Sequence, residues 1–151
     1  MREFDLSRTP IKVITAFNSA KILSNMTHDK MIMFHSNEDL NSKSFMSTYL
    51  KLSYIFREEA SLEIFVYDIG ANDYDKRRFR MLSLPSFHWI PIQGEEGPYL
   101  GAIDGGDIYS YICRHSTKNL AGFMRDGSQR IRTTLEDHEA KEENYIKNVE
   151  L

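Results

Sequence analysis

The chain has 151 residues, of which 41% are hydrophobic and 12% aromatic. That length can bury one substantial core and is too short for two ordinary domains. The net charge of −3 comes from 19 basic and 22 acidic residues spread along the chain, which argues against nucleic acid or an anionic membrane as the partner.

The first part of the chain predicts two strands with a helix between them. Residues 11–15 are typical of a short strand, and the apolar spacing over residues 17–23 predicts a helix after it. Residues 31–34 form a continuous apolar run, which is typical of a central strand buried on both faces.

A long amphipathic helix and a third strand follow. The polar stretch 36–42 is rich in residues that cap helix N-termini. Apolar side chains then recur at helical spacing: Phe45, Tyr49, Leu52 and Phe56. Residues 62–67 predict a strand that ends at Asp68, and the helical connection is long enough for this strand to pair in parallel with the one before it.

The next segment predicts a surface helix and an antiparallel hairpin. The charged residues 72–80 suit a short surface helix. Residues 82–85 must be extended, because the residue before a proline is pushed out of the helical region. Residues 86–92 and 98–103 predict two strands joined by a glycine-containing turn.

The end of the chain predicts one more helix and a tail. Residues 104–107 supply helix caps, and the apolar residues after them share one helical face. Apolar residues thin out after Phe123, so we place one domain at residues 1–123 and a charged tail, helical or flexible, at residues 124–151.

This order of elements, with a proline opening the hairpin, resembles the thioredoxin fold over residues 10–115. The resemblance implies a three-layer α/β/α domain with a mixed central sheet, in the order βαβαβαββα. In that family the proline matching Pro85 is cis and leaves neighbouring backbone groups free to pair with an extended substrate strand. The interval from Asp68 to Pro85 and the glycines of the hairpin also fit the family.

The family's redox loop corresponds here to residues 39–42. Asp39 and Ser42 stand at the two positions of the Cys-x-x-Cys motif, and neither can form or exchange a disulfide. On the same alignment, Met33 replaces the buried acidic residue that accepts a proton in active members. The resemblance therefore implies a redox-inactive, cofactor-free domain, similar to the non-catalytic domains of protein disulfide isomerases.

Compartment and membrane association are judged from what the sequence lacks. No apolar run approaches the roughly 20 residues that cross a bilayer, so no membrane span is predicted. The first residues lack the apolar stretch of a signal peptide, which favours the cytoplasm and leaves the lumen of the endoplasmic reticulum open if a signal peptide has been removed. A single cysteine, Cys113, excludes an internal disulfide and a cysteine metal cluster.

Four other features are weaker candidates for chemistry. Cys113 is expected to be a small buried hydrophobe rather than a reactive thiol. His35 and His88 could meet as a metal-binding pair, but two ligands without a third favour structural histidines and no metal. The basic residues 76–80 favour a solvated helix face over a nucleic-acid patch. Residues 25–27, Asn-Met-Thr, are an N-glycosylation sequon, which matters only in a secretory setting.

The sequence leads to one main hypothesis and one alternative, neither of them an enzyme. The main hypothesis is a binding or adaptor domain that recognises a protein or an extended peptide through two loops. Its partner-binding residues are Asn37, Glu38, Asp39, Leu84, Pro85 and Ser86. The alternative is a structural subunit of a larger assembly, of the spliceosomal or oligosaccharyltransferase type, docked through its tail and basic helix. The oligomeric state stays open.

Overall fold

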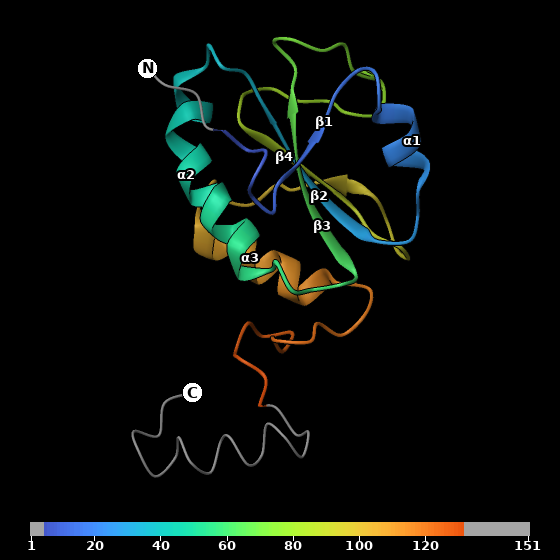
Figure 1. Cartoon of the computed structure of the whole chain (residues 1–151), viewed down its shortest axis with the longest axis vertical. Helices are drawn as coiled ribbons and strands as arrows, with labels where there is room; N and C mark the ends of the chain where they lie inside the picture. The colour runs from blue at the N-terminus through green and yellow to red at the C-terminus, as the bar shows by residue number, and fades with distance from the viewer. Residues whose placement is uncertain (1–4, 132–151) are drawn as a thin grey trace.

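A mixed sheet of five strands forms the centre of the molecule, with helices on both sides (Figure 1). The computed structural model describes residues 5–131, and residues 1–4 and 132–151 lie outside that description. The strands lie side by side in the order β1-β3-β2-β4-β5. Their bounds are β1 (Lys12–Ile14), β2 (Asp29–His35), β3 (Leu62–Asp68), β4 (Ser86–Ile90) and β5 (Gly97–Pro98).

The central strand, β2, is the apolar run that the sequence predicts to be buried on both faces. All of its 7 residues are buried, as expected for a strand with neighbours on both sides and helices above and below. β3 pairs in parallel with both β2 and β1, whereas β4 runs antiparallel to β2 and β5 antiparallel to β4. This mixed topology confirms the predicted fold class.

Three helices cover the sheet. Their bounds are α1 (Ser19–Ser24), α2 (Leu40–Ile55) and α3 (Gly105–His115). α2 and α3 lie on one face and α1 on the other (Figure 1). α2 and α3 each begin after an aspartate, Asp39 or Asp104, whose side chain accepts a hydrogen bond from the backbone N–H three residues on (2.7 and 3.1 Å). These bonds satisfy donors that a helix start leaves unpaired.

Apolar side chains fill both spaces between the sheet and its covering elements. Between the sheet and α2, Tyr49 is completely buried, and its hydroxyl lies 2.8 Å from the carbonyl oxygen of Phe65 and 3.1 Å from that of Met31. This contact ties α2 to two strands at once. On the other face, Phe34 packs against Phe79 with ring centroids 4.9 Å apart.

The helix predicted over residues 72–80 is not formed. This segment is a loop with one turn at Asp75, whose side chain accepts hydrogen bonds from the backbone N–H groups two and three residues on (3.0 and 3.1 Å). Tyr74 and Phe79 both pack into the core. Side chains five residues apart do not share a helix face, so a loop buries both where a helix would expose one.

The final hairpin is shorter than the sequence predicts. The return strand, predicted over residues 98–103, is confined to β5 because the chain turns away after it. The Tyr99 hydroxyl donates a hydrogen bond to the carbonyl oxygen of Ala102 at 2.6 Å, which closes that turn. A Cβ atom at Gly101 would lie 2.5 Å from the same hydroxyl, so the turn requires glycine there.

Residues 120–130 pack against the far ends of α2 and α3. Glu59, just after α2, accepts hydrogen bonds from the backbone N–H groups of residues 121 and 122 at 2.6 and 2.9 Å. Phe123 meets the ring of Tyr109 edge-on, with centroids 5.7 Å apart. The domain boundary after residue 123 stays a prediction, and most of the predicted tail lies outside the described residues. Within the described part of the chain, no helix is long and apolar enough to cross a membrane.

Candidate functional site

The predicted site residues meet at the edge of the sheet where β2 and β3 end and β4 begins. Because β4 runs antiparallel to β2, the register places Pro85 opposite the end of β2 at His35. After β3, the chain at Gly70 passes so close to Ser36 that a Cβ atom there would lie 2.7 Å from the serine hydroxyl. Three loops therefore come together here. Five of the six predicted residues belong to two of these loops, and Ser86 is the first residue of β4.

At the positions where the resemblance places cysteines, two polar side chains stabilise the start of α2. Asp39 accepts the hydrogen bond from the backbone N–H of Ser42 at 2.7 Å. Ser42 is buried, and its hydroxyl oxygen accepts a hydrogen bond from the backbone N–H of Ser36 at 3.4 Å. These contacts hold the loop after β2 against the helix, and neither side chain can form a disulfide.

The loop before β4 is bent over residues 82–85, not extended as the sequence predicts, and it carries apolar side chains. The peptide bond between Leu84 and Pro85 is cis. Leu82 is fully exposed and Leu84 half-buried, while Leu40 at the start of α2 is 72% exposed. Among the described residues, none donates or accepts a hydrogen bond with the backbone of residues 82–84. A segment of this kind can pair with an extended chain, and the leucines can pack against its side chains.

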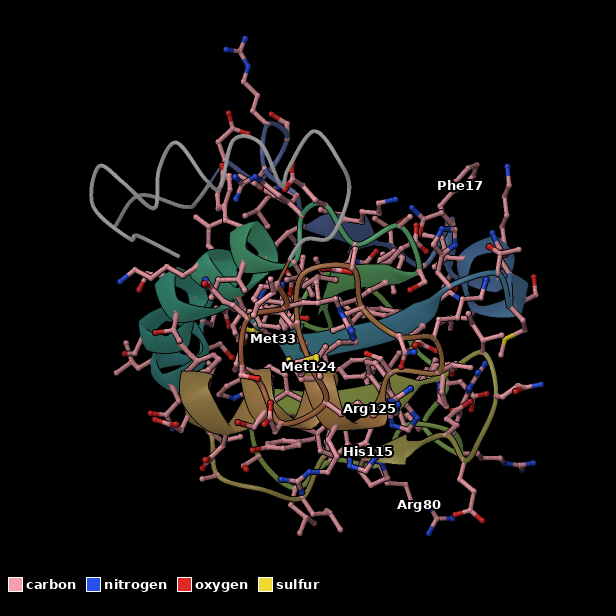
Figure 2. All side chains as sticks on the ribbon, turned by 90° about the horizontal axis from the view of Figure 1, so that it is seen from below. Phe17, Met33, Arg80, His115, Met124 and Arg125 are labelled. Carbon is pink, nitrogen blue, oxygen red and sulfur yellow. The ribbon has the colours of Figure 1, made fainter. Side chains whose placement is uncertain are left out.

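Met33 occupies the position at which active members of the family have a buried acidic proton acceptor. Met33 is completely buried in the core shared with α2, and Figure 2 shows it in the interior, whereas Phe17, in the loop after β1, projects from the surface with 99% exposure. A thioether carries no titratable proton. Beside α2, this position therefore cannot support proton transfer.

The single thiol lies on α3, and its surroundings disfavour the reactive form. Cys113 is buried, and burial raises the pKa of its thiol, although a hydrogen bond with Tyr109 acts in the opposite direction. The thiolate is the nucleophilic form of cysteine, so a raised pKa lowers reactivity at neutral pH. The prediction of a buried, unreactive cysteine agrees with this environment.

His35 and His88 do not form the pair that was considered from sequence. His88 on β4 lies opposite Ile32 on β2, and successive side chains of a strand point to opposite faces. His35, three residues after Ile32, therefore faces the other side of the sheet. Burial lowers the pKa of both imidazoles, which suits structural histidines. The described residues contain no group of three or more His, Cys, Asp or Glu side chains placed to hold a metal ion.

The structure shows a charged cluster that sequence reasoning missed. Glu96, in the turn between β4 and β5, accepts two hydrogen bonds from the guanidinium of Arg78 at 2.7 Å each, and it lies 2.8 Å from Nε2 of His88. The hydrogen bonds from Arg78 lower the pKa of Glu96. Arg80, by contrast, projects outward (Figure 2). Arg78 and Glu96 are 18 residues apart on irregular segments, a spacing that gives no sequence signal.

A groove with a volume of about 540 Å³ separates α2 from α3. Leu52 and Ile55 of α2 line one side, and Tyr109 and Phe123 the other, with Lys51 as the charged residue. None of the six predicted site residues lines it. The groove is therefore a separate surface feature.

A curated protein resembles the chain in sequence. No protein-family model matches the chain. A curated Schistosoma mansoni protein named "Probable protein disulfide-isomerase ER-60" is 28% identical over 120 residues, which cover 78% of this chain and 25% of that protein. The chain thus spans about a quarter of the length of this relative.

Solved structures resemble the fold at lower sequence identity. Zinc-bound human ERp44 matches 68% of this chain with a TM-score of 0.57 and 18% identity, over 30% of its own chain. The J-Trx1 fragment of ERdj5 matches 70% with a TM-score of 0.58 and 16% identity, over 51% of its own chain. Full-length ERdj5 matches 72% with a TM-score of 0.61 and 14% identity, over 17% of its own chain. The chain therefore has a thioredoxin-like fold, similar to that of protein disulfide isomerase-type proteins, and its single cysteine leaves it without a Cys-x-x-Cys motif.

Proposed function

We propose that this chain is a redox-inactive thioredoxin-like domain that binds an extended segment of a protein partner at the sheet edge formed by residues 36–39 and 82–86. The observation that carries the proposal is the backbone of residues 82–84, which makes no hydrogen bond to the rest of the described chain. It stands beside Pro85 and the start of α2, where a bound strand would find both backbone partners and side chains.

Recognition at this edge combines three kinds of contact. The backbone around Leu84 pairs with the backbone of the partner, which supplies affinity independent of sequence. The exposed Leu82 and Leu40 offer apolar contacts. Glu38 and Asp39 place carboxylates next to Leu40 along the chain, so a partner that combines apolar and basic side chains is favoured over an acidic one.

The absence of redox activity is part of the proposal. Asp39 and Ser42 hold the helix start, Met33 supplies no proton acceptor, and Cys113 is buried with a raised thiol pKa. An insulin-reduction assay should therefore give no rate above the background of the reductant alone. A rate that disappears in Cys113→Ala would contradict this part of the proposal.

The relative's name indicates where such a domain would work. Protein disulfide isomerases act where protein disulfides form and persist, which in a eukaryotic cell is the lumen of the endoplasmic reticulum. We place this domain in that compartment, where its role is to hold a polypeptide without exchanging its disulfides. The chain matches a quarter of the relative, so we extend to it a binding role and no isomerase activity.

Capture of peptides on an array of overlapping segments from secreted proteins tests the binding site. Leu84→Asp and Asp39→Ala should both weaken capture, because the first places a charge in the strand-pairing segment and the second removes a carboxylate from the loop. Ile131→Asp is the matched control, since it adds a charge at a residue 62% exposed outside this edge. Equal capture by all four proteins would rule out this site.

The alternative of a docked structural subunit keeps an exposed basic segment, because Lys76, Arg77 and Arg80 are exposed. Residues 76–80 are not the expected basic helix, and Arg78 is already paired with Glu96. The other predicted contact, the tail, lies largely outside the described residues. Deletion of residues 132–151 separates the two readings, because an edge binder keeps its peptide whereas a tail-docked subunit loses its assembly.

A further inference from the structure

The loop between α1 and β2 carries the sequon Asn25-Met26-Thr27, which the binding function does not use. It is the only Asn-x-Ser/Thr triplet in the 151-residue sequence, so the sequence offers one acceptor site for an N-linked glycan. All three residues are exposed. An N-linked glycan requires an exposed asparagine, because this bulky hydrophilic group cannot be buried in a folded domain.

The hydrogen bonds around Asn25 hold its backbone and leave its amide nitrogen available. Its backbone N–H ends α1 by donating to the carbonyl oxygen of Ile22 at 3.2 Å, and its own carbonyl oxygen accepts a hydrogen bond from Nζ of Lys30. The side-chain oxygen Oδ1 accepts from the backbone N–H of Thr27 at 3.1 Å and from its hydroxyl at 2.7 Å. Nδ2, the atom that a glycan would modify, has no hydrogen-bond partner among the described residues.

We propose that Asn25 is an N-glycosylation site of this protein. The amide nitrogen Nδ2 forms a bond to C1 of the reducing-end sugar and loses one proton. The bond between C1 and the phosphate oxygen of a lipid-linked oligosaccharide pyrophosphate breaks, and the lipid pyrophosphate leaves with that electron pair. The inference rests on the lumenal location in the proposed function, because the donor and its transferase act on translocated chains.

The position of Asn25 keeps a glycan away from the candidate binding site. Asn25 lies before the start of β2 at Asp29, whereas the binding edge follows its end at His35. A strand of 7 residues at about 3.3 Å each spans roughly 20 Å. The glycan and a bound peptide would therefore occupy opposite ends of the domain, and modification at Asn25 should leave peptide capture unchanged.

Translation of the full chain behind a cleavable signal sequence, in the presence of rough microsomes, tests the site. Protease-protected wild-type protein should show one slower-migrating band that endoglycosidase H removes. Thr27→Ser keeps the sequon and should keep the band. Thr27→Val removes the hydroxyl at nearly constant shape and should lose it.

Asn25→Asp is the matched structural control, because a carboxylate accepts both hydrogen bonds from Thr27 but has no amide to modify. It should fold as the wild type does and show no shifted band. In protein purified from its own cells, peptide-N-glycosidase should convert residue 25 to aspartate, which mass spectrometry detects. Protected wild-type protein without a shift, a shift that persists in Asn25→Asp, or native protein with unmodified Asn25 would each overturn the proposal.

These outcomes are independent of peptide binding. The peptide array uses the Asn25→Asp protein, which carries no glycan, so its result does not depend on the modification. No capture by this protein, with a glycan found on wild-type Asn25, would refute the proposed function alone. Capture by this protein, with no glycan found on wild-type Asn25, would refute the modification site alone.

Discussion

Restoring cysteines at residues 39 and 42 tests whether these positions correspond to the redox loop of active thioredoxins. Positions three apart on a helix have Cβ atoms about 5–6 Å apart, and a disulfide spans roughly 4 Å between Cβ atoms. A small adjustment of the first turn of α2 therefore suffices to close the bond. We expect the Asp39→Cys/Ser42→Cys double variant to form an intramolecular disulfide under mild oxidation and to reduce insulin at a measurable rate.

The cost to stability follows from the two contacts that the substitutions remove. Loss of the Asp39 cap costs about 1 kcal/mol, and loss of the long hydrogen bond between Ser42 and Ser36 costs about 0.5 kcal/mol. The reduced variant should therefore unfold with a free energy about 1.5 kcal/mol below that of the wild type, which for a chain of this size lowers Tm by about 3 to 6 °C. Chemical denaturation of the reduced protein measures this difference.

The rate of the restored enzyme carries a second expectation. The start of α2 stabilises a thiolate at residue 39, since helix N-termini lower cysteine pKa values. Met33, however, leaves the site without a proton acceptor, so insulin reduction should be slower than that of an active thioredoxin. Each single variant is the control, because one cysteine at this site cannot complete a turnover. If the oxidised double variant keeps both new thiols free while folded, the placement of the redox loop at residues 39–42 is wrong.

Three further predictions concern the contacts that hold the fold. Glu59→Ala removes the acceptor of two backbone hydrogen bonds and should lower the free energy of unfolding by about 2–4 kcal/mol and speed proteolysis within residues 120–130, whereas unchanged proteolysis would show that this carboxylate does not anchor the segment. Tyr49→Phe should cost about 1–2 kcal/mol in denaturant unfolding, because the hydroxyl that links α2 to the strands is lost, and a neutral result would mean that this contact contributes nothing. Burial lowers the pKa of folded His88, so the unfolded chain takes up its proton first and acidification through the ordinary histidine range destabilises the protein. His88→Gln should therefore lose less stability than wild type between about pH 7 and about pH 5, and an equal loss would assign the pH dependence to other groups.

The sheet was predictable because its strands are short runs with strong local patterns. The fully buried β2 is a continuous apolar segment, and α2 combines a capping residue at Asp39 with apolar side chains at helical spacing. Such signals lie within a few neighbouring residues. The order of strands could then be inferred from connection lengths and from the resemblance that Pro85 supports.

The irregular segments were predicted less well, because distant contacts decide their structure. The charged residues 72–80 fit a helix by composition, yet the burial of Phe79 and the pairing of Arg78 with Glu96 hold them in a loop. The return strand ends early because Tyr99 bonds to its own turn. The local sequence pattern of these segments does not indicate such contacts.

The candidate site was predictable in part. The missing cysteines could be read directly at Asp39 and Ser42, but the unpaired backbone of residues 82–84 and the approach of Gly70 to the loop after β2 are properties of the folded chain. His35 and His88 do not form a pair, because the alternation of side chains along the strands places them on opposite faces of the sheet. The sequence could predict that His35 and His88 lie near the same edge of the sheet. The face to which each side chain points follows only from the register between β2 and β4.

The replacement of a cysteine by Asp39 changes what the start of α2 can do. In an active thioredoxin this helix terminus stabilises a thiolate that appears and disappears with the redox state. Here it stabilises a carboxylate that also caps the helix, and that charge does not depend on any oxidant or reductant. Binding at this edge should accordingly follow the charge of the partner and the ionic strength rather than the redox state. The substitution that removes disulfide exchange thus places an acidic side chain at the start of α2, in the edge that we propose as the binding site.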